Sequence, residues 1–186
     1  MTTDPDPALA FPSWLDAART GDAQGFSALY DWLGPEVKRF AIGRGARDAE
    51  AVTNDAFVAA FRRLGDFDGD AAGFRSWIYA IVRNGLIDAH RAEQRRPDVA
   101  TGPGGDPAPA ASAEDIALAG LGFGRAPELL ASLTEAQRDV IVCRIVNGLS
   151  LEETADAVRR PVTAVKRLQA RALTQLRQRI SDEGVS

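Results

Sequence analysis

Basic side chains are concentrated near the C-terminal end of the chain. Residues 159–179 contain seven Lys or Arg residues and no Asp or Glu: Arg159, Arg160, Lys166, Arg167, Arg171, Arg177 and Arg179. The whole chain of 186 residues has a net charge of −4, so the remaining residues carry −11. Lys and Arg neutralise phosphates, and Arg also hydrogen-bonds to base edges. The stretch therefore offers anion binding, with nucleic acid as the first candidate and a solvated basic surface as the alternative.

A second group of residues mixes aromatic rings with cations between residues 66 and 91. Phe67, Phe74, Trp77 and Tyr79 occur there among Arg75, Arg83, Asn84 and Arg91. Aromatic faces stack on unpaired bases while arginines hold the backbone, so the mixture suits single-stranded nucleic acid. The helical spacing of Phe74, Trp77 and Ile81 equally predicts core positions for these rings. We expect an outward-facing row made of Arg75, Tyr79, Arg83, Arg91 and Arg95.

Other kinds of chemistry find little support in the composition. The only cysteine, Cys143, excludes an internal disulfide and a Cys-rich zinc site, and its apolar neighbours predict a buried thiol. The only histidine, His90, forms no metal-binding motif, and we find no catalytic triad, P-loop or dinucleotide-binding motif. We therefore expect no catalytic residue, metal or cofactor. The sequence shows no apolar run of ~18 residues and no signal peptide. We therefore expect a cytoplasmic location and no membrane partner.

The elements that position these residues are all predicted to be helical, so the expected fold class is all-α. In the N-terminal part, Asp48 is placed to cap a helix and Gly34-Pro35 to break one. The predicted helices there are Pro12–Arg19, a second that starts after Gly21-Asp22 and reaches Trp32, a further piece from Pro35 to Ile42, Ala49–Leu64, and Phe74–Arg91.

The C-terminal part carries two capping boxes, Thr134 with Gln137 and Ser150 with Glu153. They predict helices at 135–146 and Leu151–Val158, and a tight turn leads to a third helix, Thr163–Ile180. The last two helices have the outline of a helix-turn-helix. In the third helix, one face is apolar (Val165, Leu168, Ala172, Leu176 and Ile180), and the other is basic and polar (Thr163, Lys166, Arg167, Ala170, Arg171 and Thr174).

The chain divides into two small helical domains, residues 1–92 and 127–186. Residues 93–126 between them are rich in Pro, Gly and Ala and contain few groups able to form a core. This composition predicts a flexible linker.

Five segments together resemble a bacterial RNA polymerase sigma factor of the extracytoplasmic-function (ECF) type, and the first, RTGDAQGFSALYDWLGPEVKRFA (19–41), looks like the start of sigma region 2. The most specific is FRSWIYAIVRNGLIDAHR (74–91), which is similar to a segment of sigma region 2, as is DAEAVTNDAFVAAFRRL (48–64). LTEAQRDVIVCRIVNGLSLEETADAV (133–158) resembles the start of sigma region 4. AVKRLQARALTQL (164–176) resembles the final helix of an actinobacterial variant of that region.

The resemblance implies a promoter-specificity subunit that has no chemistry of its own. Region 2 would bind the clamp helices in the largest subunit of core RNA polymerase, at positions matching Glu50, Asn54, Asp55 and Arg62. It would also capture the melted −10 promoter element, at positions matching Phe67, Asp68, Phe74, Arg75, Tyr79, Arg83 and Asn84. Region 4 would bind the flap of the second-largest subunit and read the duplex −35 element through Arg160, Thr163, Lys166, Arg167, Ala170 and Arg171. Many members of the family are held by an anti-sigma protein, which would be a further partner.

Three positions depart from the family pattern. Ala51 replaces an Asp and Asn54 replaces a Gln in the clamp-binding motif, which predicts a weaker polymerase contact. Thr163 replaces the glycine of the turn before the last helix. Because a β-branched residue tolerates positive φ poorly, we expect the Thr163 hydroxyl to cap that helix instead.

Two other kinds of protein remain as alternatives. A helix-turn-helix repressor or activator that binds duplex DNA alone accounts for the C-terminal part but leaves FRSWIYAIVRN unexplained. A helical adaptor that binds only protein leaves the doubly capped helix-turn-helix unexplained. An enzyme is the least supported class.

Overall fold

The computed structural model describes residues 6–95 and 126–183, and every secondary-structure element among them is helical. The all-α class predicted from the sequence is therefore confirmed. Residues 6–95 are called the N-terminal unit below, and residues 126–183 the C-terminal unit. The predicted linker, 93–126, lies almost wholly outside the described residues. None of the helices in the described ranges has an apolar stretch long enough to cross a membrane.

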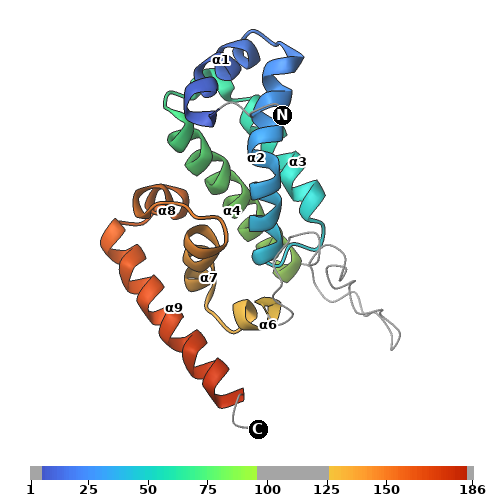
Figure 1. The fold of residues 1–186 in the computed structure, drawn as a ribbon. Helices are drawn as coiled ribbons and strands as arrows, with labels where there is room; N and C mark the ends of the chain where they lie inside the picture. The colour runs from blue at the N-terminus through green and yellow to red at the C-terminus, as the bar shows by residue number, and fades with distance from the viewer. Residues whose placement is uncertain (1–5, 96–125, 184–186) are drawn as a thin grey trace, which may run out of the picture.

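The N-terminal unit is built from four α-helices around one aromatic core (Figure 1). The elements are α1 (Pro7–Arg19), α2 (Ala23–Gly43), α3 (Ala49–Phe61), the short 3-10 helix η1 (Leu64–Asp66) and α4 (Ala71–Arg95). The side chains of Asp6, Asp22 and Asp48 each accept a backbone N–H at the start of α1, α2 and α3. These caps satisfy amide groups that would otherwise lack a partner. Phe11, Phe40, Phe57 and Phe74 are buried at the centre.

The predicted break at Gly34-Pro35 is wrong, because α2 continues through both residues to Gly43. Leu29, Leu33, Val37 and Phe40 form a stripe along α2 that is 0–1% exposed. A proline inside a helix costs about 3 kcal/mol. Burial of each large apolar side chain contributes roughly 1.5–3 kcal/mol, so the stripe outweighs the proline.

The C-terminal unit contains α6 (Ala126–Ala131), α7 (Glu135–Ile141), a π-helical turn η2 (Val142–Val146), α8 (Leu151–Val158) and α9 (Val162–Glu183). Both predicted capping boxes are present, at Thr134 with Gln137 and at Ser150 with Glu153. They fix the starts of α7 and α8, and α8 and α9 follow one another around a tight turn. The predicted helix-turn-helix is therefore confirmed as a structure.

The two units pack against each other. Helix α8 lies along α4, and η2 packs against α2, while α9 extends away from the N-terminal unit (Figure 1). Val140, Val142, Cys143 and Leu149 of the C-terminal unit belong to the same buried cluster as Phe40 and other residues of the N-terminal core. Cys143 is buried, as its apolar neighbours predict. We call this contact the inter-unit interface.

At Gly43 the backbone of α2 lies close against Val142 of the C-terminal unit. A Cβ atom at this position would lie 2.9 Å from Cγ2 of Val142 and 3.0 Å from its Cγ1. Val142 is fully buried and β-branched, so it has little freedom to move aside. A glycine at the end of α2 is thus required by this packing.

Candidate nucleic-acid interface

Helix α9 has the two faces that the sequence predicts over most of its length. Val165 and Ala172 are fully buried against the rest of the C-terminal unit, and Leu168 and Leu176 are half-buried. The six residues predicted for duplex DNA are all exposed: Arg160, Thr163, Lys166, Arg167, Ala170 and Arg171. Ile180, predicted on the buried face, is instead 56% exposed because it lies near the end of α9, beyond the packed part. The start of α9 therefore presents a cationic surface to solvent.

The turn before α9 differs from the expected one. Helix α9 begins at Val162, and the Pro161 carbonyl accepts the N–H groups of Ala164 and Val165. Thr163 consequently lies inside the helix and does not cap it, which corrects the prediction. The left-handed residue is Arg159, the C-cap of α8, with φ 52° and ψ 52°. It is the only non-glycine residue with positive φ in the described ranges.

Tyr79 is the clearest error in the predicted single-strand surface. It was expected to face outward, but it is fully buried, with its ring edge-on to Phe40 at 4.9 Å. Burial, followed by the nearby negative charge of Glu36, raises the pKa of its hydroxyl. The spacing of Arg75, Tyr79 and Arg83 does place them along one row of α4. The C-terminal unit covers that row. The prediction was therefore wrong about the surroundings of this face of α4, which packs against protein and not solvent.

Arg75, on α4, contacts residues of both units. Its Nη2 donates to the carbonyl oxygen of Asn147 at 2.6 Å and lies 2.7 Å from Oε2 of Glu36. Its Nη1 lies 3.6 Å from Oε1 of Glu153, the capping-box residue of α8. The guanidinium is therefore occupied by acceptors and is 20% exposed.

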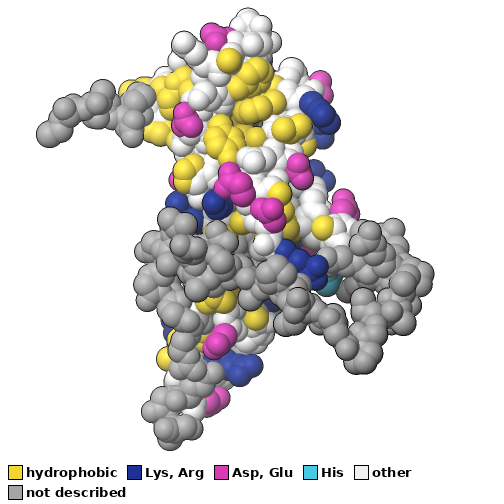
Figure 2. Space-filling model, turned by 90° about the vertical axis from the view of Figure 1, so that its right-hand side faces the viewer, with side chains coloured by type: hydrophobic (Ala, Val, Ile, Leu, Met, Phe, Trp, Pro, Cys, Tyr) yellow, Lys and Arg dark blue, Asp and Glu magenta, His cyan; other side chains and the backbone are white. Residues whose placement is uncertain are grey.

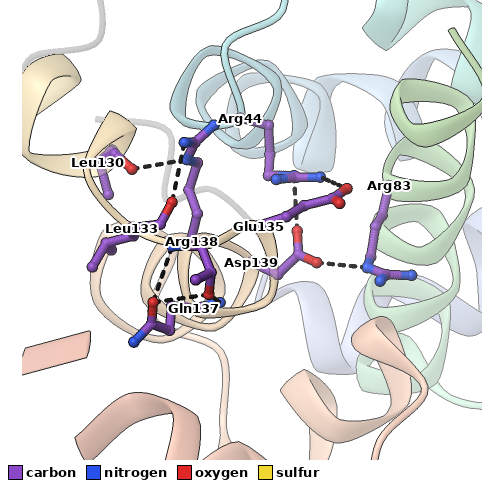
Figure 3. Close-up of polar contacts among 9 residues, drawn as sticks. Arg44, Arg83, Leu130, Leu133, Glu135, Gln137, Arg138 and Asp139 are labelled. Atoms are coloured by element: carbon purple, nitrogen blue, oxygen red, sulfur yellow. Dashed lines mark hydrogen bonds and ion pairs between the residues drawn. The ribbon is translucent and has the colours of Figure 1, made fainter. Parts of the chain in front are cut away.

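Arg83 takes part in a second ionic cluster, centred on Asp139 of α7 (Figure 3). Arg83 Nε donates to Asp139 Oδ2 at 2.7 Å. Arg44 Nε lies 2.8 Å from Asp139 Oδ1, and Arg44 Nη2 donates to Glu135 Oε1 at 2.9 Å. The side chains of Asp139 and Arg44 are only 1% and 5% exposed. Two cations of the N-terminal unit thus hold one buried carboxylate of the C-terminal unit.

The remaining predicted single-strand residues lie in the loop before α4 and along α4 itself. Phe67 is 9% exposed and stacks on Trp77 with ring centroids 5.1 Å apart, while Phe74 is fully buried beneath them. Arg19 of α1 donates to the carbonyl oxygen of Phe67 and holds this loop in place. Of the others, Asp68 is exposed and Asn84 half-buried. Arg91 is exposed as expected, and the side chain of Arg95 lies outside the described residues.

The residues predicted for polymerase binding lie on α3 and its C-cap, away from the C-terminal unit. Glu50, Asn54, Asp55 and Arg62 are all exposed. Lys38 Nζ lies 2.8 Å from Glu50 Oε2, and the Tyr30 hydroxyl donates to Asn54 Oδ1 at 2.8 Å. Helix α3 packs mainly on α2 and α4. Figure 2 views this side and shows acidic side chains standing among apolar ones on the N-terminal unit.

The inter-unit interface buries polar atoms that have no hydrogen-bond partner within the described residues. They include Arg75 Nε, the Tyr79 hydroxyl, Asn147 Oδ1 and Thr154 Oγ1. Glu36 Oε2, Arg44 Nε and Asp139 Oδ1 also lack an aligned hydrogen bond, although each lies in an ion pair. A buried polar atom without a partner costs about 1–3 kcal/mol. The interface therefore contributes less free energy of stabilisation than its buried area alone would suggest.

The residues of this interface that sequence reasoning missed are Arg44, Glu36 and Asp139. Asp139 did carry a signal, because it is the one acidic residue in the otherwise apolar run 139–143. A carboxylate in such a run is almost never fully buried without a cationic partner. The partners themselves are 56 and 95 positions away and could not be identified from spacing.

Known proteins match this chain over both units. The family model for Sigma-70 region 2 matches residues 29–96, and the model for Sigma-70, region 4 matches residues 129–178. The chain is 31% identical over 172 residues to the ECF RNA polymerase sigma factor BldN of Streptomyces coelicolor. That alignment covers 91% of this chain and 65% of BldN. Identity to the ECF RNA polymerase sigma factor SigD of Mycobacterium tuberculosis is 30% over 175 residues, covering 90% of this chain and 82% of SigD.

Two solved structures share the fold. CnrH, in complex with the cytosolic domain of CnrY, has a TM-score of 0.67 at 24% identity, covering 91% of this chain and 96% of CnrH. The sigma factor RpoE, in complex with the anti-sigma factor NepR from Bartonella quintana, also has a TM-score of 0.67, at 19% identity, covering 86% of this chain and 98% of RpoE. At these identities the likeness concerns the fold.

Proposed function

The chain belongs to the extracytoplasmic-function (ECF) family of RNA polymerase sigma factors, and on that premise we propose that it recognises promoters in two parts. Members of this family are promoter-specificity subunits, and catalysis belongs to the polymerase. The C-terminal unit would read the duplex −35 element, and the N-terminal unit would capture the melted −10 strand. The domain division at 1–92 and 127–186, with a linker at 93–126, is part of the same proposal.

Recognition of the −35 element would rest on the start of α9. A helix-turn-helix inserts this end of its second helix into the major groove. Lys166, Arg167 and Arg171 are exposed there, and the helix dipole adds to the attraction for phosphate. Thr163 and Ala170 lie on the same exposed face, where they would contact bases or sugar, and Arg160 precedes the helix. This exposed basic face, on a helix-turn-helix whose first helix starts with a capping box, is the observation that carries the proposal.

Capture of the −10 strand would rest on α4 and the loop before it. Arg75, Arg83 and Asn84 would hold the backbone or hydrogen-bond to bases, and Asp68 lies exposed in the loop. Phe67 and Trp77 supply a stacked aromatic pair beside that loop. Phe74 and Tyr79 are fully buried in this arrangement, so neither would touch DNA.

Core RNA polymerase would bind at two places. Helix α3 would meet the clamp helices of the largest subunit through Glu50, Asn54 and Asp55, with Arg62 at its C-cap. The C-terminal unit would meet the flap of the second-largest subunit. The solved relative RpoE is held by the anti-sigma factor NepR, and we propose an anti-sigma protein as a further partner of this chain.

Reconstitution with core RNA polymerase tests the proposal. The purified chain should bind core polymerase and direct transcription from a cognate promoter found by selection from a randomised promoter library. A chain that binds a duplex promoter tightly without polymerase and never joins the core enzyme would be a repressor or activator instead.

A further inference from the structure

Helix α2 contacts two of the α3 residues that are proposed to meet polymerase. The Tyr30 hydroxyl donates to Oδ1 of Asn54 at 2.8 Å. Nζ of Lys38 lies 2.8 Å from Oε2 of Glu50. The contacts follow one another in opposite order along α2 and α3, as expected of antiparallel helices that pack together. Part of the proposed clamp-binding surface is therefore held by α2.

The two contacts differ in how firmly α2 holds them. The side chains of Lys38 and Glu50 are 34% and 56% exposed, and water and salt weaken an ion pair so open to solvent. The ring of Tyr30 instead packs on the buried ring of Phe57, with centroids 4.8 Å apart. Only two side-chain torsions separate this ring from the backbone, so fixing the ring also fixes the hydroxyl. Tyr30 is therefore the firmer support.

Gly34 provides the space in which the Tyr30 ring lies. A Cβ atom at position 34 would lie 3.2 Å from Cε1 of Tyr30 and 3.4 Å from its Cζ, tighter than ordinary van der Waals contact. Gly34 is in the interior of α2, where glycine is less favourable than alanine. The glycine that was predicted to break the helix thus leaves room for a ring whose hydroxyl reaches α3.

We infer that Tyr30 is a positioning residue for the contact between Asn54 and polymerase. Its hydroxyl proton is directed to Oδ1 of Asn54, which leaves Nδ2 of the amide, with two N–H donors, to face a partner. The polymerase surface opposite Asn54 should therefore present an acceptor, a carboxylate or carbonyl oxygen. The inference rests on the proposed function, because it names the group that orients one residue of the clamp-binding surface.

Orientation of the amide before binding favours association. An exposed asparagine side chain that moves freely loses this freedom when a partner holds it, and the loss lowers affinity. With the Tyr30 contact in place, the free chain already holds the Asn54 amide in one orientation. Burial, followed by the negative charge of Glu50, raises the pKa of the Tyr30 hydroxyl, so this group remains a proton donor at neutral pH.

Tyr30→Phe tests the inference, because it removes the hydroxyl and keeps the ring on Phe57. Affinity for core RNA polymerase should fall about threefold or more, the usual scale for one hydrogen bond. Fluorescence anisotropy of the full chain, labelled at its N-terminus, measures this affinity. Ser27→Ala is the matched control, since it removes an exposed α2 hydroxyl that donates to Asp31 at 3.1 Å, and it should leave the affinity unchanged. The midpoint of urea denaturation should match the wild type in both variants.

A double-mutant cycle separates positioning from any other effect of the hydroxyl. In the Asn54→Ala background, Tyr30→Phe should change core affinity by less than about 1.5-fold, because the amide that Tyr30 orients is absent. Asn54→Asp tests which way the hydrogen bonds run. Its carboxylate still accepts from Tyr30 but has no N–H to donate, so core affinity should fall about as far as in Asn54→Ala.

Equal effects of Tyr30→Phe in the wild-type and Asn54→Ala backgrounds would overturn the inference. Wild-type affinity of Tyr30→Phe or of Asn54→Asp would overturn it as well. A lower denaturation midpoint for Tyr30→Phe would assign the hydroxyl to the stability of the fold and not to positioning. Failure of the proposed function would look different, as a wild-type chain that does not bind core polymerase at all.

Discussion

Oδ2 of Asp139, on α7, lies 2.7 Å from Nε of Arg83, on α4. The pair joins helices from opposite units whose residues are 56 positions apart in the sequence. The Asp139 side chain is 1% exposed and Arg83 17%, so the carboxylate depends on its cationic neighbours for stability. One ion pair therefore connects the packing of the two units with the surface proposed to bind the −10 strand.

Asp139→Ala should lower the free energy of unfolding by about 3 kcal/mol, as expected when one partner of a buried ion pair is removed. The loss arises because Arg44 and Arg83 keep their charges without the carboxylate that faces them. Urea denaturation followed by circular dichroism measures it.

A double-mutant cycle separates the Asp139–Arg83 interaction from general damage. The cycle with Arg83→Ala should give a coupling energy of about 1 kcal/mol or more. Glu152→Ala, at an exposed position on α8, should change stability by less than about 0.5 kcal/mol. A coupling near zero would show that the two side chains do not interact in solution.

Tyr79→Phe should raise the free energy of unfolding by about 1 kcal/mol, because it removes a buried hydroxyl that lacks a partner. The variant should also change the response to alkaline pH. Burial raises the pKa of Tyr79 above the ordinary value of 10.0, so the folded chain keeps this proton while the unfolded chain loses it. Tyr79 therefore makes the wild type lose stability above pH 10.

Denaturation series across alkaline pH check the sign of this effect. A single such group lowers stability by about 1.4 kcal/mol per pH unit above the unfolded pKa. Burial also raises the pKa of the Cys143 thiol from 9.0, so both proteins should retain a decline that begins near pH 9. If the free energies of unfolding of the wild type and Tyr79→Phe fell in parallel above pH 10, a buried Tyr79 would be excluded.

Arg159→Gly should stabilise the chain by up to about 1 kcal/mol, since glycine adopts φ 52° without the strain of a Cβ atom. Arg159→Val should destabilise it, because a β-branched residue tolerates this conformation poorly. Thermal unfolding of the three proteins gives the order Gly, Arg, Val. If valine proved as stable as arginine, the turn would have a different backbone conformation.

Lys166→Ala and Arg171→Ala should weaken binding to the −35 element but leave core polymerase binding intact. Each lost phosphate contact should reduce the slope of log affinity against log salt by roughly 0.9. Titrations of the holoenzyme on promoter DNA at several salt concentrations measure the slope. Gln178, exposed on α9 beyond these residues, supplies a control substitution to Ala that should change neither property. Loss of core binding in the two variants would instead indicate misfolding or a wrong assignment of α9.

Local sequence patterns predicted much of the fold. The caps at Asp48, Thr134 and Ser150 were predictable because each pairs a side-chain acceptor with the backbone amide three residues away. The two faces of α9 were predictable from the helical spacing of its apolar residues. That spacing matches the observed burial from Val165 to Leu176. The continuation of α2 through Pro35 was not predictable, since it depends on the core that Leu29, Leu33 and Phe40 enter.

The candidate site could be predicted only in part for a similar reason. The helical period correctly grouped Arg75, Tyr79 and Arg83 on one row of α4. Periodicity gives no information on whether solvent or another helix covers such a row. Here the C-terminal unit covers it, so Arg75 faces Asn147 and Glu153, Arg83 faces Asp139, and Tyr79 is buried. Contacts between residues so distant in sequence leave no local pattern.

Energy transfer between dyes on the two units tests most directly the claim that the units pack against each other. Cysteines introduced at the exposed positions Ala72 on α4 and Glu152 on α8 would carry the dyes, while native Cys143 is buried. The free chain should give high transfer, as the packing of α8 along α4 requires. Transfer no higher than that of the urea-unfolded chain would contradict the account.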